Sequence, residues 1–302
     1  MEFIQANVPS TGILRGIKEE EDRAAIRESV KKIVNQFKKG KIELPVLPRI
    51  IEDVQKVIRD PKSDTDDLAR VIENDAVISV RLISVANSAI YRGAEDITTV
   101  KKAIPRMGTN ETQNIISSIA NKSLYLSKNE NFKMMMESLW RHSLATATAA
   151  KIIVQRTIRS EPDKFYMLGL LHDIGKVLLL KAFSEIIPNA EDFNMNQIMD
   201  TIQSYHVDFG AALLNRWKFS NEFVRVVQNH ENPTIEDNSS KEIVVVHLAN
   251  LLTRKIGFSL IEESEERLSE TTAAQALNLD AERLDSICRD TEEIVQQTMN
   301  TL

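Results

Sequence analysis

Apolar positions recur along most of this chain at the three- and four-residue spacing of amphipathic α-helices. Residues 1–17 show little pattern, and a charged stretch with a narrow apolar stripe then runs from about Lys18 to Lys39, before Gly40. Glycine and proline are scarce, at 9 and 8 of 302 residues, and aromatic residues make up only 5%. Strands favour aromatic and β-branched residues with frequent turns, whereas this chain is rich in helix formers. The pattern predicts an all-α protein.

Short helices are expected between residues 41 and 128, because proline and capping residues interrupt the apolar periodicity there. Acidic and hydroxyl residues at 63–67 provide N-terminal capping chemistry for one of these helices. Thr98 and Thr99 open another, which we expect to break near Pro105 and Gly108. The region predicts a compact N-terminal helical bundle.

Longer helices are expected after residue 129. One helix should run from Phe132 to about Arg156, and the next should begin at Pro162 and reach His172. Separate helices are predicted at Gln197–Tyr205 and Val207–Trp217. The predicted organisation is an N-terminal arm and helix at 1–40, a helical subdomain at 41–128, a second, HD-like helical subdomain at 129–258 and a C-terminal helical extension at 259–302.

Charge and cysteine content limit the classes of function. The formal net charge of −6 provides no basic excess to neutralise phosphates, which makes nucleic-acid binding an unfavoured function. The single Cys288 excludes an internal disulfide framework and suits a reducing compartment. No apolar stretch approaches the roughly 20 residues of a membrane helix, and the N-terminus lacks a secretory pattern. We expect a cytoplasmic protein that does not associate with membranes.

The apolar run Leu168–Leu180 carries three side chains that a core segment should not hold without a reason. His172 and Asp173 offer a nitrogen and an oxygen ligand, and this pair suits Zn, Fe or Mn. Neighbouring residues do not share a helix face, so the two can converge only where a helix ends or bends. Gly175 is expected to provide that end, close to Lys176.

The chain has five histidines, and each lies within or beside an apolar-periodic stretch: His142, His172, His206, His230 and His247. Such a pattern is compatible with a metal centre and also with structural histidines that bind no metal. Asp173 and Lys176 could equally form an ion pair at a helix boundary. His206 and His230 could equally be residues at the start and end of helices, where a histidine interacts well with the helix dipole.

Several motifs together resemble the HDOD (HD-related output) domain of bacterial signalling proteins, a branch of the HD superfamily of metal-dependent phosphohydrolases. The resemblance covers roughly residues 44–232, with the stretch at 241–255 as an extension. It rests on Leu44-Pro45 to Pro48, the Asp-rich turn at 64–67, Glu73-Asn74-Asp75, Asn87-Ser88-Ala89 with Tyr91, Ala103-Ile104 with Met107-Gly108, His142, Gly169 to Lys176, His206 with Gly210 to Leu214 and Trp217, and His230.

The resemblance implies roles for individual residues. His142, His172 and Asp173 match the first metal ligands of the family, and His206 and His230 match the additional histidines of its dinuclear branch. One or two divalent transition-metal ions, Fe, Mn or Zn, are then the expected cofactor, and the structural alternative expects none. Lys176 matches the lysine that faces substrate phosphate in active relatives, so Asp173 and Lys176 are the candidate catalytic residues.

One position departs from the pattern of active relatives. Their late metal-binding Asp would fall in the helix around Val246–Asn250, where this chain has Asn250. A neutral amide binds divalent cations more weakly than a carboxylate and cannot act as a base. His247 lies three residues earlier and could compensate only with a different geometry.

The sequence therefore supports two hypotheses about function. The first is a bacterial signal-transduction module with a degenerate HD-type metal site, which acts by binding a partner protein or a small ligand such as a nucleotide. The second is an active metal-dependent phosphohydrolase or phosphodiesterase that acts on a nucleotide or a cyclic dinucleotide. No receiver, kinase or DNA-binding segment is recognisable, so we expect input and output to come through other chains.

Overall fold

The computed structural model describes residues 28–29, 31–36, 39, 45, 47–186, 195–236, 239–259 and 267–301. Helices account for all the regular secondary structure of these residues, and the predicted all-α fold is confirmed. Most of the arm and helix expected at 1–40 lies outside the described residues. In the part of the chain that is described, no helix is long and apolar enough to cross a membrane.

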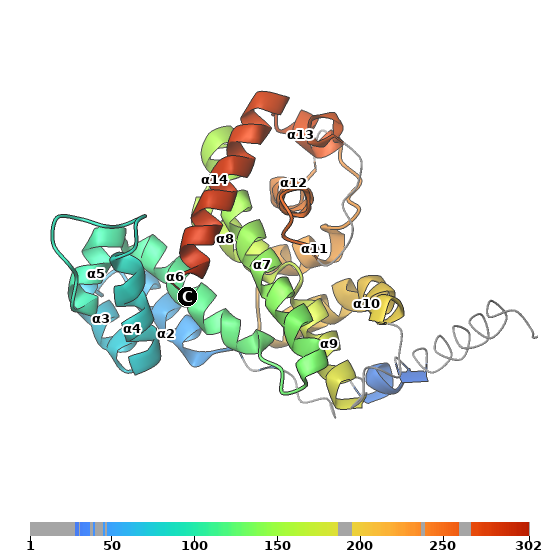
Figure 1. Cartoon of the computed structure of the whole chain (residues 1–302), viewed down its shortest axis with the longest axis horizontal. Helices are drawn as coiled ribbons and strands as arrows, with labels where there is room; N and C mark the ends of the chain where they lie inside the picture. The colour runs from blue at the N-terminus through green and yellow to red at the C-terminus, as the bar shows by residue number, and fades with distance from the viewer. Residues whose placement is uncertain are drawn as a thin grey trace, which may run out of the picture.

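The N-terminal bundle contains five short helices, which lie together on one side of the molecule (Figure 1). Capping chemistry explains several of their boundaries: Asp64 and Asp67 form a reciprocal capping box, and Thr99 accepts a hydrogen bond from the backbone N–H of Lys102. The helix that was expected to break near Pro105 and Gly108 contains Pro105 and ends at Met107, with Gly108 as its C-cap. The helices are α2 (Arg49–Arg59), α3 (Thr65–Glu73), α4 (Ala76–Ala86), α5 (Val100–Met107) and α6 (Thr109–Lys122).

The second half of the molecule is built around one 28-residue helix, α7, which runs through its centre (Figure 1). A short 3₁₀ turn, Ser123–Tyr125, connects α6 to this region. The remaining helices are α7 (Glu130–Thr157), α8 (Pro162–Leu171), α9 (Ile174–Ile186), α10 (Met195–Arg216), α11 (Asn221–Asn229), α12 (Lys241–Lys255), α13 (Thr272–Ala276) and α14 (Ala281–Met299), with a second 3₁₀ turn at Leu268–Glu270.

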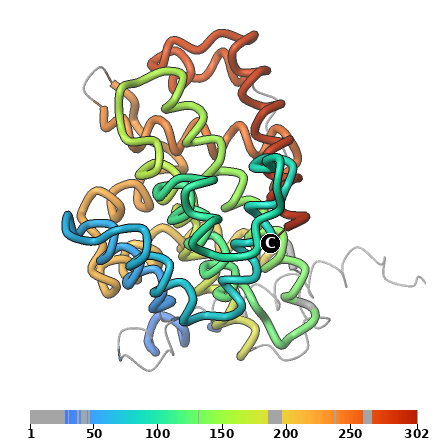
Figure 2. Tube along the Cα trace, turned by 90° about the vertical axis from the view of Figure 1, so that its left-hand side faces the viewer, coloured from blue at the N-terminus to red at the C-terminus, as the bar shows by residue number. Residues whose placement is uncertain are grey.

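The C-terminal helix α14 connects the two halves of the fold. Both views place its final turns next to the N-terminal bundle (Figures 1 and 2). Ile294 and Thr298 of α14 line one cavity together with Tyr91 and Glu111 of the N-terminal bundle. The C-terminal extension therefore packs against both halves rather than standing apart from them.

Small residues on α7 allow its neighbours to approach closely. Ala145, Ala147 and Ala149 are fully buried. At Gly169 on α8, an added Cβ would lie 2.7 Å from the Cα of Ala147, so only glycine allows this spacing between the helices. The close contact of α7 with α8 brings the buried His142 towards the end of α8.

Two details of the predicted helices are wrong. The helices expected at Gln197–Tyr205 and Val207–Trp217 form one continuous helix, α10, with His206 in its interior. Gly175 does not end a helix, because α8 ends at Leu171 and α9 begins at Ile174. It serves close packing instead, since an added Cβ would collide with the backbone carbonyl of His206 and lie 2.7 Å from the backbone nitrogen of Gly210.

Candidate metal centre

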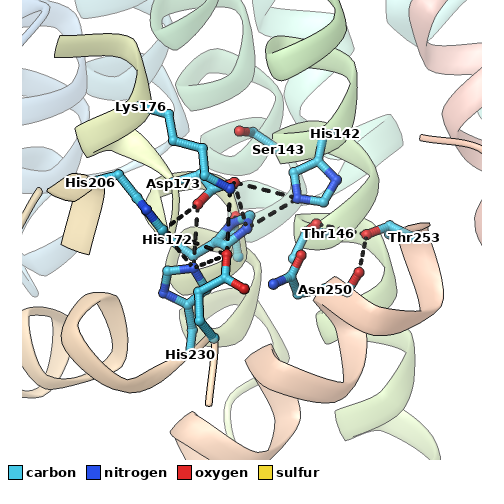
Figure 3. A network of polar contacts seen from close by, with 12 residues as sticks. His142, Ser143, Thr146, His172, Asp173, Lys176, His206, His230, Asn250 and Thr253 are labelled. Atoms are coloured by element: carbon cyan, nitrogen blue, oxygen red, sulfur yellow. Dashed lines mark hydrogen bonds and ion pairs between the residues drawn. The ribbon is translucent and has the colours of Figure 1, made fainter. Parts of the chain in front are cut away.

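Four imidazole rings converge in the interior of the second half (Figure 3). They come from four different places in the fold: His142 from α7, His172 from the break after α8, His206 from α10 and His230 from the end of α11. All four are buried, with at most 4% of their surface exposed. Packing between helices far apart in sequence therefore creates the cluster.

Backbone carbonyls fix the orientation of every one of these rings. The Nδ1 atoms of His142, His172, His206 and His230 lie 2.6, 2.7, 2.8 and 2.9 Å from the carbonyl oxygens of Phe258, Gly169, Gln203 and Val227. A carbonyl can only accept a hydrogen bond, so each Nδ1 carries a proton and each Nε2 faces the centre of the cluster. This is the arrangement of metal-ligating histidines, whose second nitrogen donates to an outer partner.

Asp173 lies between two pairs of these rings. Its Oδ2 atom is 3.4 Å from the Nε2 of His172 and 3.6 Å from that of His142. Its Oδ1 atom is 3.3 Å from the Nε2 atoms of both His206 and His230. The carboxylate is completely buried and connects the two pairs.

The predicted convergence of His172 and Asp173 has a simple backbone cause. The two residues form the break between α8 and α9, so their side chains are not restricted to different faces of one helix. Asp173 also begins the next helix, since its carbonyl accepts a hydrogen bond from the N–H of Lys176 at 2.9 Å.

A second carboxylate, Glu231, completes the cluster and was missed in the sequence. Its Oε1 atom lies 3.5 Å from the Nε2 of His230 and 3.6 Å from that of His206. The position of Glu231 directly after His230, at the end of a helix where the chain turns, could have indicated this role. Two groups of donors result, and they share Asp173: His142, His172 and Asp173 in the first group; Asp173, His206, His230 and Glu231 in the second.

Two cations lie against the carboxylates of the centre. The ammonium of Lys176, which is 4% exposed, lies 2.8 Å from Asp173 Oδ2 and 3.4 Å from Glu231 Oε1. The predicted ion pair of Asp173 and Lys176 is therefore present, and it lies inside the donor cluster. Arg254 donates to both oxygens of Glu231, at 2.8 and 2.9 Å.

Burial and charge set the protonation of the cluster. Burial lowers the pKa of His142 to about 3 and that of His206 to about 4, and it also lowers the pKa of His172. Burial opposes the imidazolium of His230 too, but hydrogen bonds with Asp173 and Glu231 raise its pKa to about 9. Burial disfavours the charged form of Asp173, yet the ammonium of Lys176 holds the pKa of this carboxyl well below its usual range. Neutral imidazoles and an ionised carboxylate are the forms that bind metals.

The remaining two candidate positions lie on α12. Asn250 is 1% exposed, and its Oδ1 atom has no hydrogen-bond partner among the described residues. Thr253 connects this turn of α12 to α7, since its hydroxyl contacts both the carbonyl of Asn250 and the hydroxyl of Thr146 at 3.0 Å (Figure 3). His247 belongs to neither donor group, and its Nδ1 contacts the carbonyl oxygen of His230 at 2.7 Å.

The donor set fits a metal ion. The Nε2 atoms of His142 and His172, both neutral rings, lie 3.2 Å apart, and those of His206 and His230 lie 3.4 Å apart. Two neutral rings that both carry their protons on Nδ1 cannot hydrogen-bond through their Nε2 atoms, so a cation shared by His142 and His172 would relieve their contact. Buried imidazole and carboxylate donors of this kind suit Zn, Fe or Mn.

A helical fold with such a centre defines an HD-type protein, and comparison with known proteins agrees. Residues 44–233 match the model of the HDOD domain, which is more than half of the chain. The chain belongs to the HDOD family. The segment from residue 234 onwards, which contributes Asn250, Arg254 and Phe258, lies outside the match.

Solved structures share this architecture. A candidate metal-dependent phosphohydrolase from Shewanella amazonensis SB2B is 25% identical, with a TM-score of 0.73, over 91% of this chain and 99% of its own. An HDOD domain protein of unknown function from Geobacter sulfurreducens is 21% identical, with a TM-score of 0.67, over 93% of this chain and 97% of its own. The second similarity shows the fold alone.

An uncharacterised protein of Treponema pallidum (strain Nichols) is 24% identical over 220 residues. The matched region is 70% of this chain but only 42% of that relative. The chain therefore spans less than half the length of the curated relative it matches.

Proposed function

We propose that this chain is a bacterial signal-transduction module with a degenerate HD-type metal centre, which acts by binding a partner protein or a small ligand. The observation that carries the proposal is Asn250, a buried neutral amide at the position where active relatives are expected to hold a carboxylate. The first donor group then has one carboxylate, Asp173, and that carboxylate is shared with the second group.

The proposed centre holds a divalent transition metal, Fe, Mn or Zn. His142, His172 and Asp173 would hold one ion, and Asp173, His206, His230 and Glu231 a second. A bound metal of this kind supplies a Lewis acid and an activated water near neutral pH. The backbone carbonyls that hold the four Nδ1 atoms keep the rings aimed at the centre, and burial keeps bulk water away from it.

A second candidate function is favoured by the more complete donor group. Asp173, His206, His230 and Glu231 provide four donors with two carboxylates, and Lys176 lies beside them. In this alternative the chain is a metal-dependent phosphodiesterase that acts on a nucleotide or a cyclic dinucleotide. Lys176 would then stabilise negative charge on the substrate phosphate during transfer, with Asp173 holding its ammonium in place.

The expected partners follow from the first proposal. They are one or more signalling proteins, with a nucleotide as a candidate ligand, in the cytoplasm. The net charge of −6 supports neither nucleic acid nor an anionic membrane surface as a partner.

The metal content of the untagged full chain tests the proposal. Elemental analysis should find near-stoichiometric Fe, Mn or Zn in the wild type and a loss of most of it in His172→Ala. His247→Ala is the matched control, because it removes a histidine near the centre that belongs to neither donor group, and it should keep its metal. A folded wild type without metal would overturn the proposed metal centre.

A chromogenic phosphodiester separates the two functions. Bis(p-nitrophenyl) phosphate should not be hydrolysed above the rate of His172→Ala if the centre is degenerate. Turnover that is lost in His172→Ala and kept in His247→Ala would replace the first function by the second.

A further inference from the structure

The segment that follows the family-matched region contacts the metal centre at three points. The carbonyl of Phe258 accepts from Nδ1 of His142 at 2.6 Å. His247 on α12 contacts the carbonyl oxygen of His230 at 2.7 Å. Arg254, one turn after Asn250 on the same helix, binds both oxygens of Glu231. Each contact reaches a donor residue or its backbone from outside residues 44–233.

The contact of Arg254 with Glu231 has the strongest geometry of the three. One guanidinium nitrogen of Arg254 donates to Oε1 at 2.8 Å and to Oε2 at 2.9 Å. The two side chains are largely buried, at 18% and 14% exposure. Charge-assisted hydrogen bonds of this kind are strong and fix the orientation of the carboxylate.

Arg254 makes the shortest contacts that hold the side chain of Glu231. Glu231 lies just after the end of α11, where the backbone turns, and a glutamate has three rotatable side-chain bonds. Its other cation, Lys176, is farther away at 3.4 Å and also binds Asp173. Without Arg254, the carboxylate would be held, among the described residues, only by the longer contacts with Lys176, at 3.4 Å, and with the Nε2 atoms of His230 and His206, at 3.5 and 3.6 Å.

We infer that Arg254 is a positioning residue that holds Glu231 as a ligand of the second metal ion, so that occupancy of this position depends on α12. The inference rests on the proposed metal centre. It makes the C-terminal part of the chain an input to the centre, since a movement that draws the side chain of Arg254 away would release Glu231. Removal of such outer partners typically lowers metal affinity 10- to 100-fold.

The positive charge of Arg254 and its positioning role have opposite effects on metal affinity, so one substitution distinguishes them. A guanidinium next to a metal ligand repels a dication, so a purely electrostatic role predicts tighter binding when Arg254 is removed. A positioning role predicts weaker binding. The two effects of the same substitution differ in sign.

The test is a Zn²⁺ titration of the full chain, with stoichiometry from equilibrium dialysis and the affinities of the two ions from competition with a chromophoric chelator. Arg254→Gln should bind one of the two ions about 10- to 100-fold less tightly than the wild type, with the affinity for the other ion unchanged. Arg156→Gln is the matched control, because it removes another arginine–carboxylate pair, with Asp290, far along α7. It should bind both ions as the wild type does.

A second variant shows that the effect passes through Glu231. Glu231→Gln should weaken the same ion, and the double variant should be no weaker than Glu231→Gln alone, because residues that act through one another are not additive. Equal or tighter binding of both ions by Arg254→Gln, or additive losses in the double variant, would overturn the inference. A wild type that binds no Zn²⁺ would instead overturn the proposed function, so the two failures are distinct.

Discussion

Two polar networks of this protein, one buried and one half-buried, differ in how far their groups satisfy one another. The first is the candidate metal centre. The second, the junction network, joins the N-terminal bundle to α7 and α8 and consists of Tyr91, Glu111, Asn114, Lys151 and Asp163. Both contain carboxylates and an ammonium, and both connect helices that are far apart in sequence.

In the junction network, donors meet acceptors throughout. Glu111 accepts from the hydroxyl of Tyr91 at 2.6 Å and also from Lys151. Asp163 accepts from the amide of Asn114 at 2.6 Å and from Lys151 at 3.1 Å. These contacts pair one ammonium with two carboxylates, and the network serves to hold the halves together.

In the metal centre, by contrast, some acceptors have no donor. The Nε2 atoms of His142 and His172, both neutral rings, lie 3.2 Å apart, and the Oδ1 atom of Asn250 has no hydrogen-bond partner among the described residues. Buried polar groups left in this way need an explanation, and an ion is the one that fits their chemistry. The comparison indicates that neighbouring acceptors without a donor, rather than buried charge alone, distinguish the candidate metal centre from the junction network.

Breaking the junction network should have the largest effect on stability. Lys151→Met leaves Glu111 and Asp163 without their shared cation and should lower the free energy of unfolding by about 3 kcal/mol. Urea unfolding of the metal-free protein measures this loss. The metal content should stay at the wild-type value, because Lys151 belongs to neither donor group.

Lys133→Met is the matched control on the same helix. Lys133 pairs with Glu130 at the surface and is 58% exposed, so its loss should change the unfolding free energy by less than about 0.5 kcal/mol. A Lys151→Met variant as stable as Lys133→Met would contradict the assignment of a structural role to the junction network.

Adding a carboxylate to the metal centre should increase the difference between the metal centre and the junction network. Asn250→Asp should raise the affinity for Zn²⁺ by at least about 10-fold, because a carboxylate binds divalent cations better than an amide. The same change should lower the Tm in the presence of a chelator, since it buries another charge near Asp173. Asn110→Asp, an exposed substitution on α6, is the control and should change neither quantity. Unchanged affinity in Asn250→Asp would place Asn250 outside the ligand positions.

The smallest effect is expected at a second fully paired cluster, in which Lys164 binds Glu222 at 3.0 Å and Glu242 at 2.9 Å. Burial opposes the charge of Glu242, but hydrogen bonds from Lys164 and Ser240 lower its pKa to about 2, from an ordinary 4.5. A lowered pKa contributes stability above pH 4.5, and this contribution is lost as the pH falls towards 2.

Glu242→Gln should therefore remove part of the acid sensitivity of the fold. Between pH 6 and pH 2, its unfolding free energy should fall by about 1 kcal/mol less than that of the wild type, after allowance for solvent screening. Glu270→Gln removes an exposed partner of Arg267 and serves as the control. Identical pH dependence in Glu242→Gln and the wild type would show that this cluster does not contribute to acid unfolding.

Much of the fold could be predicted from the sequence because its signals are local. Apolar periodicity identified the helices, and capping residues such as Asp64 and Thr99 set their boundaries. The candidate residues His142, His172, Asp173, Lys176, His206 and His230 could also be named, since histidines within apolar helices are unusual and their order resembles that of a known family.

Tertiary structure decided what depends on residues far apart in the chain. Gly175 resembled a helix end locally, but its role is the close contact with α10. Local signals also divided α10 at His206, although packing keeps it continuous. Arg254 carried no local sign of its role, and Glu231 carried only its position directly after His230, because an acidic or basic residue near a helix end is usually exposed to solvent. Their roles exist only because α11 and α12 bring them together beside the histidines. Helix formation is a property of neighbouring residues, whereas the donor geometry of a centre built from several helices is a property of how those helices pack.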